Sequence, residues 1–192
     1  MEVTDLLWTP RCYNASMSSF PIQVARTLIA FAKPSQSLLE PSILQLRVGL
    51  ADLDENLHMN NARYFDHMNR ARMELAARTG MLAYMFRNKM SFLAGAVSLR
   101  FRKDLAYRQR YELHTQTAYW DEDWVVFEQR FMVDGRARAV GLARGQIRNA
   151  QGRVRPVDFL GMMGEQVPER PRLQPHVEAW FAWLSAEKGR LP

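Results

Sequence analysis

Five polar side chains with the functional groups of acyl-transfer chemistry lie close together in one short stretch of the chain. Asp54, Asn56 and His58 supply a carboxylate, an amide and an imidazole at alternate positions, and Asn60 and Asn61 follow directly. Asparagine is a favoured N-cap residue, and the free backbone N–H groups at a helix start can polarise a carbonyl oxygen. The stretch therefore combines a candidate base or nucleophile with a candidate oxyanion site.

Two interpretations of this stretch compete. Asp and Asn favour turns and caps because their side chains bond to nearby backbone groups, and this local role explains most such clusters. The longer run D-L-D-E-N-L-H-M-N-N-A-R-Y-F, residues 52–65, favours a functional role because it resembles the signature of the hotdog-fold acyl thioesterases. It is similar to the 4-hydroxybenzoyl-CoA thioesterase-like family, to the plant acyl-ACP thioesterases with N-x-H-V-N-N, and to animal thioesterase-superfamily proteins with H-M-N-N-A-R-Y. The resemblance covers roughly residues 44–164.

The resemblance implies a role for each residue of the motif. Asp54 matches the second aspartate of the family's D-x-D, the catalytic carboxylate, and is expected to act as base or nucleophile. Asn56 and His58 match the N-x-H of the plant enzymes and are expected to position and activate water. The backbone N–H of Asn61 would hold the thioester oxygen, while Asp52 would orient the loop.

Substrate contacts are expected from the motif and from a basic run further along the chain. Asn60 and Tyr64 belong to the motif, and Arg100, Arg102 and Lys103 belong to the basic run. A solvated sheet face is the default interpretation of such a run, and a surface for the phosphates of coenzyme A or of phosphopantetheine is the functional one. The formal net charge of +6 suits an acidic ligand. Coenzyme A would enter as part of the substrate, no other cofactor is expected, and no motif indicates nucleic acid.

Hydrophobic periodicity defines the elements that must position the motif. A strand is predicted over 43–50 from period-two spacing, and a helix over 61–79 from apolar residues at three- and four-residue steps. The Met-rich segment 81–90 is predicted to be a short helical or irregular turn, either as core or as the lining of an acyl pocket. Four later strands are predicted over 93–102, 111–119, 125–133 and 137–148, with a two-residue turn at Asp134-Gly135.

One strand, one long helix and four antiparallel strands make an α+β chain in the hotdog order, an antiparallel sheet wrapped around a long central helix. Small residues at alternate positions from Ala137 to Gly145 predict that the helix lies against the last strand. In the strand 93–102, Leu93 and Val97 are expected on one face. A single unit leaves sheet edges unpaired, and members of the family place the active site at a dimer interface. A homodimer or tetramer is therefore implied.

Three regions are expected along the chain. Residues 1–42 form an N-terminal extension with a short helix over 20–33, residues 43–164 form the hotdog domain, and residues 165–192 form a Pro-rich tail. The tail ends in an amphipathic helix that is expected to cover the sheet edge or the dimer surface. The helix over 20–33 is shorter than the about 20 apolar residues that a bilayer requires, so no transmembrane segment is expected.

Cysteine and histidine usage narrows the chemistry further. The lone Cys12 excludes an intrachain disulfide and makes the cytoplasm the expected location. His67, His114 and His176 lack metal-ligand spacing and a plausible partner, so no metal site is expected. The expected function is hydrolysis of an acyl-CoA or acyl-carrier-protein thioester to free acid and thiol. The alternatives are a hotdog protein that binds acyl thioesters or fatty acids without turnover, and a hotdog dehydratase or hydratase.

Overall fold

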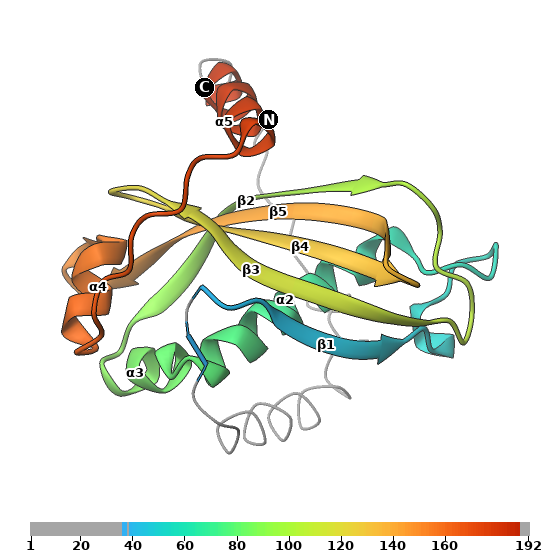
Figure 1. The fold of residues 1–192 in the computed structure, drawn as a ribbon, viewed down its shortest axis with the longest axis horizontal. Helices are drawn as coiled ribbons and strands as arrows, with labels where there is room; N and C mark the ends of the chain where they lie inside the picture. Colours follow the sequence, from blue (N-terminus) through green and yellow to red (C-terminus); the bar gives the residue numbers. More distant parts are fainter. Residues whose placement is uncertain (1–35, 38, 189–192) are drawn as a thin grey trace, which may run out of the picture.

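One antiparallel sheet forms the body of the protein, and the long helix α2 lies along one of its faces (Figure 1). The structure is a computed structural model and describes residues 36, 37 and 39–188. The strands are β1 (Ser42–Arg47), β2 (Ser91–Phe101), β3 (Arg110–Trp120), β4 (Val125–Val133), β5 (Arg136–Asn149) and β6 (Gly152–Val154). The helices are the 3-10 helix η2 (Leu50–Asp52), α2 (Asn61–Arg78), α3 (Met81–Arg87), α4 (Pro156–Met162) and α5 (Pro175–Lys188). The helix predicted over 20–33 and Cys12 lie outside the described residues.

The sheet has the strand order β1-β3-β4-β5-β2, and the short β6 pairs with β5. The predicted order of one strand, one long helix and four antiparallel strands is confirmed. Asp134 and Gly135 form the turn between β4 and β5 with φ of 49° and 71°, and this left-handed geometry suits a tight hairpin. The first strand is shorter than predicted, because it ends at Arg47 and Leu50 begins η2 with its side chain 72% exposed.

Helix α2 packs closely on the sheet because the strand beneath it carries small residues. Tyr64, Met68, Ala71 and Leu75 are buried on the helix face toward the sheet. A Cβ added at Gly141 in β5 would lie 2.5 Å from the Cε of Met68. The end of the Met68 side chain therefore lies directly over Gly141 and would have to move for a larger residue, so the prediction that the helix lies against the last long strand is confirmed.

A β-bulge in β2 overturns one predicted face. Ala94 pairs with Gly145 and Ala96 with Arg144, so Gly95 is an extra residue on β2. Val97 pairs with Ala143 and Leu93 with Gln146, partners three positions apart in β5, and the two side chains therefore point to opposite faces. The expectation that Leu93 and Val97 share a face was wrong, because an inserted residue reverses the alternation.

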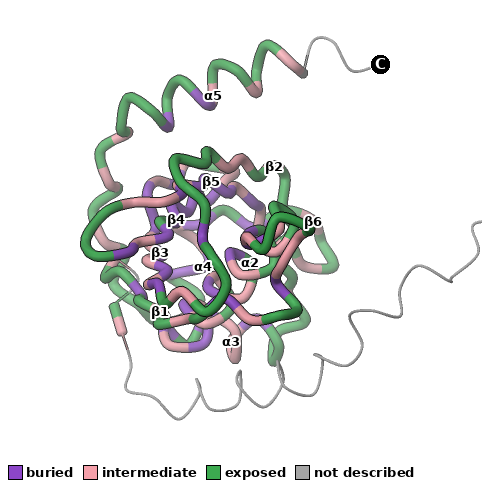
Figure 2. Tube along the Cα trace, turned by 90° about the vertical axis from the view of Figure 1, so that its right-hand side faces the viewer, coloured by how far each residue is buried: buried purple, intermediate pink, exposed green. Residues whose placement is uncertain are grey.

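Helix α5 covers the outer face of the sheet, which is the face opposite α2 (Figure 1). Val177 and Trp180 are buried there in a cluster with Val126 and Leu142. Figure 2 shows α5 lying outside the purple centre of the molecule, with most of its own residues exposed. The tail helix thus covers a sheet face rather than a sheet edge. None of the helices within the described ranges is both long and apolar enough to span a membrane.

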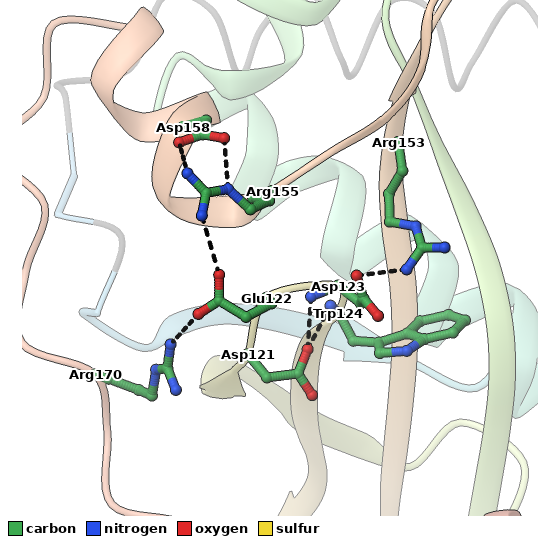
Figure 3. A network of polar contacts seen from close by, with 8 residues as sticks. All are labelled: Asp121, Glu122, Asp123, Trp124, Arg153, Arg155, Asp158 and Arg170. Carbon is green, nitrogen blue, oxygen red and sulfur yellow. Dashed lines mark hydrogen bonds and ion pairs between the residues drawn. The ribbon is translucent and has the colours of Figure 1, made fainter.

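Ion pairs join the end of β3 to the chain that leads to α5 (Figure 3). Glu122 accepts hydrogen bonds from Arg155 at 3.3 Å and from Arg170 at 3.2 Å, and Arg155 also pairs with Asp158 at 2.7 Å. Arg153 of β6 pairs with Asp123. All these side chains are exposed, so each pair contributes little to stability, and the pairs connect the turn after β3 to β6, α4 and the tail.

Candidate active site

The motif forms a tight turn directly ahead of α2. Leu53 and Met59 make an isolated antiparallel bridge, and the N–H of Asp54 donates to the carbonyl of His58 at 2.9 Å. Leu57 closes the turn with φ of 61°, and its side chain is exposed. A left-handed backbone at a residue other than glycine costs about 1–2 kcal/mol, so the surrounding contacts must hold this turn in place.

The carboxylate of Asp54 is positioned by the backbone of its own turn. Its Oδ1 accepts hydrogen bonds from the N–H of Asn56 at 2.9 Å and of His58 at 3.1 Å. Within the described part of the chain, Oδ2 has no hydrogen bond and the imidazole of His58 makes none to this carboxylate. The turn therefore fixes the orientation of Asp54 and leaves one carboxylate oxygen available to a water or a carbonyl carbon.

The start of α2 supplies an unpaired backbone donor beside this turn. Asn60 is the N-cap, and its Oδ1 accepts from the N–H of Ala62 at 2.9 Å. The carbonyl of Asn60 accepts from the N–H of Arg63 at 2.9 Å. Among the described residues no acceptor bonds the N–H of Asn61, which points out from the positive end of the helix dipole. The expected oxyanion donor is thus present as a free N–H.

The loop between β2 and β3 lies against the motif turn and brings basic residues with it. Met59 donates its N–H to the carbonyl of Leu105 at 2.8 Å, and His58 forms a bridge with Ala106. The Nδ1 of His58 lies 3.9 Å from the Oδ2 of Asp104, with both side chains largely exposed. Because Arg102 and Lys103 directly precede Asp104, the structure brings these two cations to the side of the motif.

The side chains of three other predicted site residues do not meet the carboxylate of Asp54. Tyr64 is only 1% exposed and packs edge-on against Phe101, so it supports the helix start from within the core. Burial raises the pKa of the Tyr64 hydroxyl to about 12. Arg100 pairs with Val140 and lies on the outer face of β2, away from α2. Asn56 is exposed, and its backbone N–H rather than its amide meets Asp54.

A buried network beneath the motif involves residues that sequence reasoning did not connect. The carboxylate of Asp52 accepts from the N–H of Gly49 at 2.9 Å and from the Nε of Arg63 at 3.2 Å. The Nε2 of His67 lies 3.3 Å from the same carboxylate, and Nδ1 contacts the hydroxyl of Tyr111. His67 therefore has two partners, and the expectation that it has none was wrong, as it was for His114 beside Glu112 and His176 beside Glu128.

The partners of His67 determine which ring nitrogen carries the proton. A carboxylate only accepts, so Nε2 donates to Asp52, and in the neutral imidazole Nδ1 then accepts from Tyr111. Burial lowers the pKa of His67 more than the nearby Asp52 raises it. Burial also pushes the pKa of Asp52 upward, but the N–H of Gly49 and the contacts with His67 and Arg63 outweigh it, so this pKa is lowered overall.

The buried imidazole predicts a loss of stability in mild acid. The unfolded chain binds a proton at His67 near its ordinary pKa of 6.5, while the folded chain resists it, so the free energy of unfolding falls as the pH drops below that value. Urea unfolding from about pH 8 to about pH 5 should show this decline. His67→Gln removes the titrating group, so its free energy of unfolding should fall less steeply as the pH drops. Parallel declines would contradict the assignment.

The Met-rich segment proposed as an acyl pocket lies at the other end of the sheet. Met81 and Met85 of α3 are buried, whereas Phe86 is 84% exposed. A cavity of about 20 Å³ opens beside Met81 between β3, β5 and α4, lined by Trp120, Ile147 and Phe159 among others. That volume holds about one water molecule, so in this structure these residues act as core.

Comparison with known proteins identifies relatives of this chain. A family model described as "Thioesterase-like superfamily" matches residues 48–181. Protein THEM6 of Danio rerio is 31% identical over 163 residues, which cover 84% of this chain and 79% of that protein. The solved structure of the BH1999 gentisyl-coenzyme A thioesterase has a TM-score of 0.57 at 16% identity and covers 62% of this chain and 99% of its own.

A second solved structure shares the fold. Protein SAV2348 of Staphylococcus aureus, described in complex with CoA, has a TM-score of 0.58 at 11% identity, covering 72% of this chain and 94% of its own. At these identities the likeness concerns the fold alone. It confirms the predicted hotdog arrangement of an antiparallel sheet around a central helix.

Proposed function

Because this chain belongs to the thioesterase-like superfamily, we propose that it hydrolyses the thioester bond of an acyl-CoA or acyl-carrier-protein substrate. The observation that carries the proposal is the free N–H of Asn61 at the start of α2, next to the turn that holds Asp54. A backbone donor at a helix start stabilises the negative oxygen that develops when a thioester carbonyl is attacked. The candidate base or nucleophile and the candidate oxyanion donor are therefore neighbours in the chain.

In this mechanism Asp54 attacks the thioester carbon directly or takes a proton from the attacking water. Its Oδ1 stays bonded to the backbone N–H groups of Asn56 and His58, while Oδ2 faces the reaction. The thiolate leaves and takes up a proton, and water supplies the oxygen of the free acid. His58 is proposed to orient the water, because its imidazole is half-exposed on the same turn.

The basic loop residues supply an anchor for the leaving group. Arg102 and Lys103 precede the segment that bridges to His58, and both are exposed. Guanidinium and ammonium groups bind phosphates well, so we assign the phosphates of coenzyme A or of a carrier-protein arm to this loop. The SAV2348 protein, which shares the fold, is described in complex with CoA, and this supports coenzyme A as the first ligand to test.

The hydrogen bonds of Asp54 also fit a second function, binding of acyl thioesters without hydrolysis. The Oδ1 of Asp54 accepts from two backbone N–H groups of its own turn, the arrangement of a purely structural aspartate. A protein that binds acyl thioesters without cleaving them would keep this turn. Thiol release from short, medium, long and aromatic acyl-CoAs separates the two functions. Thiol release identifies a hydrolase. Binding of a thioether analogue without any thiol release from the acyl-CoAs identifies a binding protein.

We further propose a homodimer formed through β2. Among the described strands β2 pairs only with β5, and its residues Val97 and Phe101 are 37% and 40% exposed. Phe101 also contacts Tyr64 in the first turn of α2. An unpaired edge with apolar side chains favours pairing with a second copy. A dimer through this edge would enclose the open flank of α2 next to the motif.

Two variants, one on each edge strand, test the proposed dimer interface. Light scattering should give twice the chain mass of 22.3 kDa for the wild type. Val97→Lys places a charge on the β2 edge and should yield monomer, while Ile43→Lys on the opposite edge strand β1 should stay dimeric. A monomeric wild type, or loss of the dimer only in Ile43→Lys, would contradict the β2 interface.

A further inference from the structure

One arginine of the central helix is half-buried with only amide oxygens around it. The Nη1 of Arg72 donates to the Oε1 of Gln129 at 2.6 Å, and Nη2 lies 3.5 Å from the Oδ1 of Asn69. Among the described residues no carboxylate pairs with this guanidinium, and burial lowers the pKa of Arg72 to about 10. The group remains charged at neutral pH, so within the described residues this cation has no carboxylate partner.

The flank of α2 that carries Arg72 faces the side of the sheet formed by β5 and the edge strand β2. His67 and Arg72 are five residues apart, which places them about 140° apart around the helix. His67 contacts Tyr111 in β3, and Arg72 contacts Gln129 in β4, so Arg72 lies on the side of β5 and β2 in the strand order. The half-exposed side chains of Phe65, Val97 and Phe101 are the apolar surface of this side.

The guanidinium has the donors that a ligand would need. Gln129 is fully buried and is itself fixed, since its Nε2 donates to the carbonyl of Met68 at 2.8 Å and to the hydroxyl of Thr115 at 3.0 Å. Its Oε1 therefore holds one edge of the guanidinium in place. The Nε of Arg72 makes no hydrogen bond within the described part of the chain and is not among the buried polar atoms that lack a partner, so this nitrogen is accessible to a ligand.

Helix geometry gives the distance from this cation to the reacting bond. The contacts with Asn69 and Gln129 place the guanidinium level with Met68 and Asn69, seven to eight residues beyond Asn61. At about 1.5 Å per residue this is roughly 11 Å along the axis. An extended chain advances by about 1.2 Å per bond, so the span corresponds to about nine bonds.

We propose that the guanidinium of Arg72 binds a carboxylate at the far end of the acyl group, so that the preferred substrates are carboxylate-terminated acyl thioesters of about eight to twelve carbons. This inference rests on the proposed function, because it takes the thioester carbonyl to lie at the N–H of Asn61. The methylene chain would run along Phe65 and the edge strand. A charge-assisted, forked pair with a carboxylate has the geometry that Arg supplies and Lys does not.

The test compares sebacoyl-CoA, which ends in a carboxylate, with decanoyl-CoA, which ends in a methyl group. Wild type should have kcat/KM roughly tenfold to a hundredfold higher for sebacoyl-CoA, the range of one charged hydrogen-bonded pair. Arg72→Met keeps an unbranched, flexible side chain but removes the guanidinium and its charge, and the ratio of the two kcat/KM values should fall by a similar factor. Arg78→Met is the matched control, because Arg78 lies on the same helix paired with Glu74, and it should keep the wild-type ratio.

Calorimetry with the non-cleavable thioether analogues of both ligands separates this inference from the proposed function. If both substrates are hydrolysed and the ratio of their kcat/KM values is near one, the carboxylate site is overturned and the thioesterase proposal stands. Absence of hydrolysis with preferential, Arg72-dependent binding of the sebacoyl analogue overturns the thioesterase and supports the carboxylate site. Absence of both hydrolysis and preference overturns both. A wild-type ratio near one overturns the carboxylate site whether or not Arg72→Met folds, so misfolding of the variant leaves the proposal open to contradiction.

Discussion

Asp54→Asn should lower kcat for acyl-CoA hydrolysis by about 10² or more, the usual loss when a positioned catalytic base is removed. The change is nearly isosteric, and the asparagine Oδ1 can still accept from the N–H groups of Asn56 and His58. The turn should therefore survive while the group that faces the substrate changes from a carboxylate oxygen to an amide nitrogen. Thiol release by purified wild type and variant, side by side, measures the effect.

Glu55 provides the matched control for this variant. It is an exposed carboxylate in the same turn, and Glu55→Gln removes the same charge one residue away. Its turnover should stay within about twofold of wild type, since the charge of a solvent-exposed side chain acts weakly through water. Full activity in Asp54→Asn, with the fold verified by circular dichroism, would remove Asp54 from the mechanism. Equal losses in both variants would indicate a general electrostatic effect.

Asp52→Ala should destabilise the protein by about 2–4 kcal/mol, because it removes the acceptor shared by the mostly buried His67, the N–H of Gly49 and the Nε of Arg63. The carboxylate is 11% exposed and accepts from Gly49, Arg63 and His67. The melting temperature should fall by about 5–10 °C in a chain of this size. Activity should also fall, since Arg63 and His67 link this carboxylate to the first turns of α2. Urea unfolding at neutral pH measures the stability change.

Asp104→Ala is the comparison for this prediction. Asp104 lies on the neighbouring loop, and its side chain is 71% exposed at 3.9 Å from His58. Exposed pairs of this kind contribute little, so the free energy of unfolding should change by less than about 0.5 kcal/mol. A stability change for Asp52→Ala as small as that for Asp104→Ala would mean that the buried network does not hold the motif.

Local signals in the sequence were enough for the elements and for the motif. Period-two and three-to-four spacing predicted the strands and the long helix, and Asp134-Gly135 predicted its hairpin turn, because backbone conformation follows from near neighbours. The run from Asp54 to Asn61 predicted a turn before a helix start with a free N–H, which the structure contains. These features span only a few residues, so no distant part of the chain has to be known.

Tertiary structure decided the features that depend on distant residues. The bulge at Gly95 reversed the face of Leu93, since one extra residue in a paired strand cannot be seen from alternation alone. His67 meets Asp52 and Tyr111, which are 15 and 44 positions away, and Arg72 meets Gln129 across 57 positions. The sequence by itself therefore determined the fold class and the position of the motif turn ahead of α2. The buried groups that hold this loop, and the cation that faces the open flank of α2, became evident only when the sheet brought separate segments together.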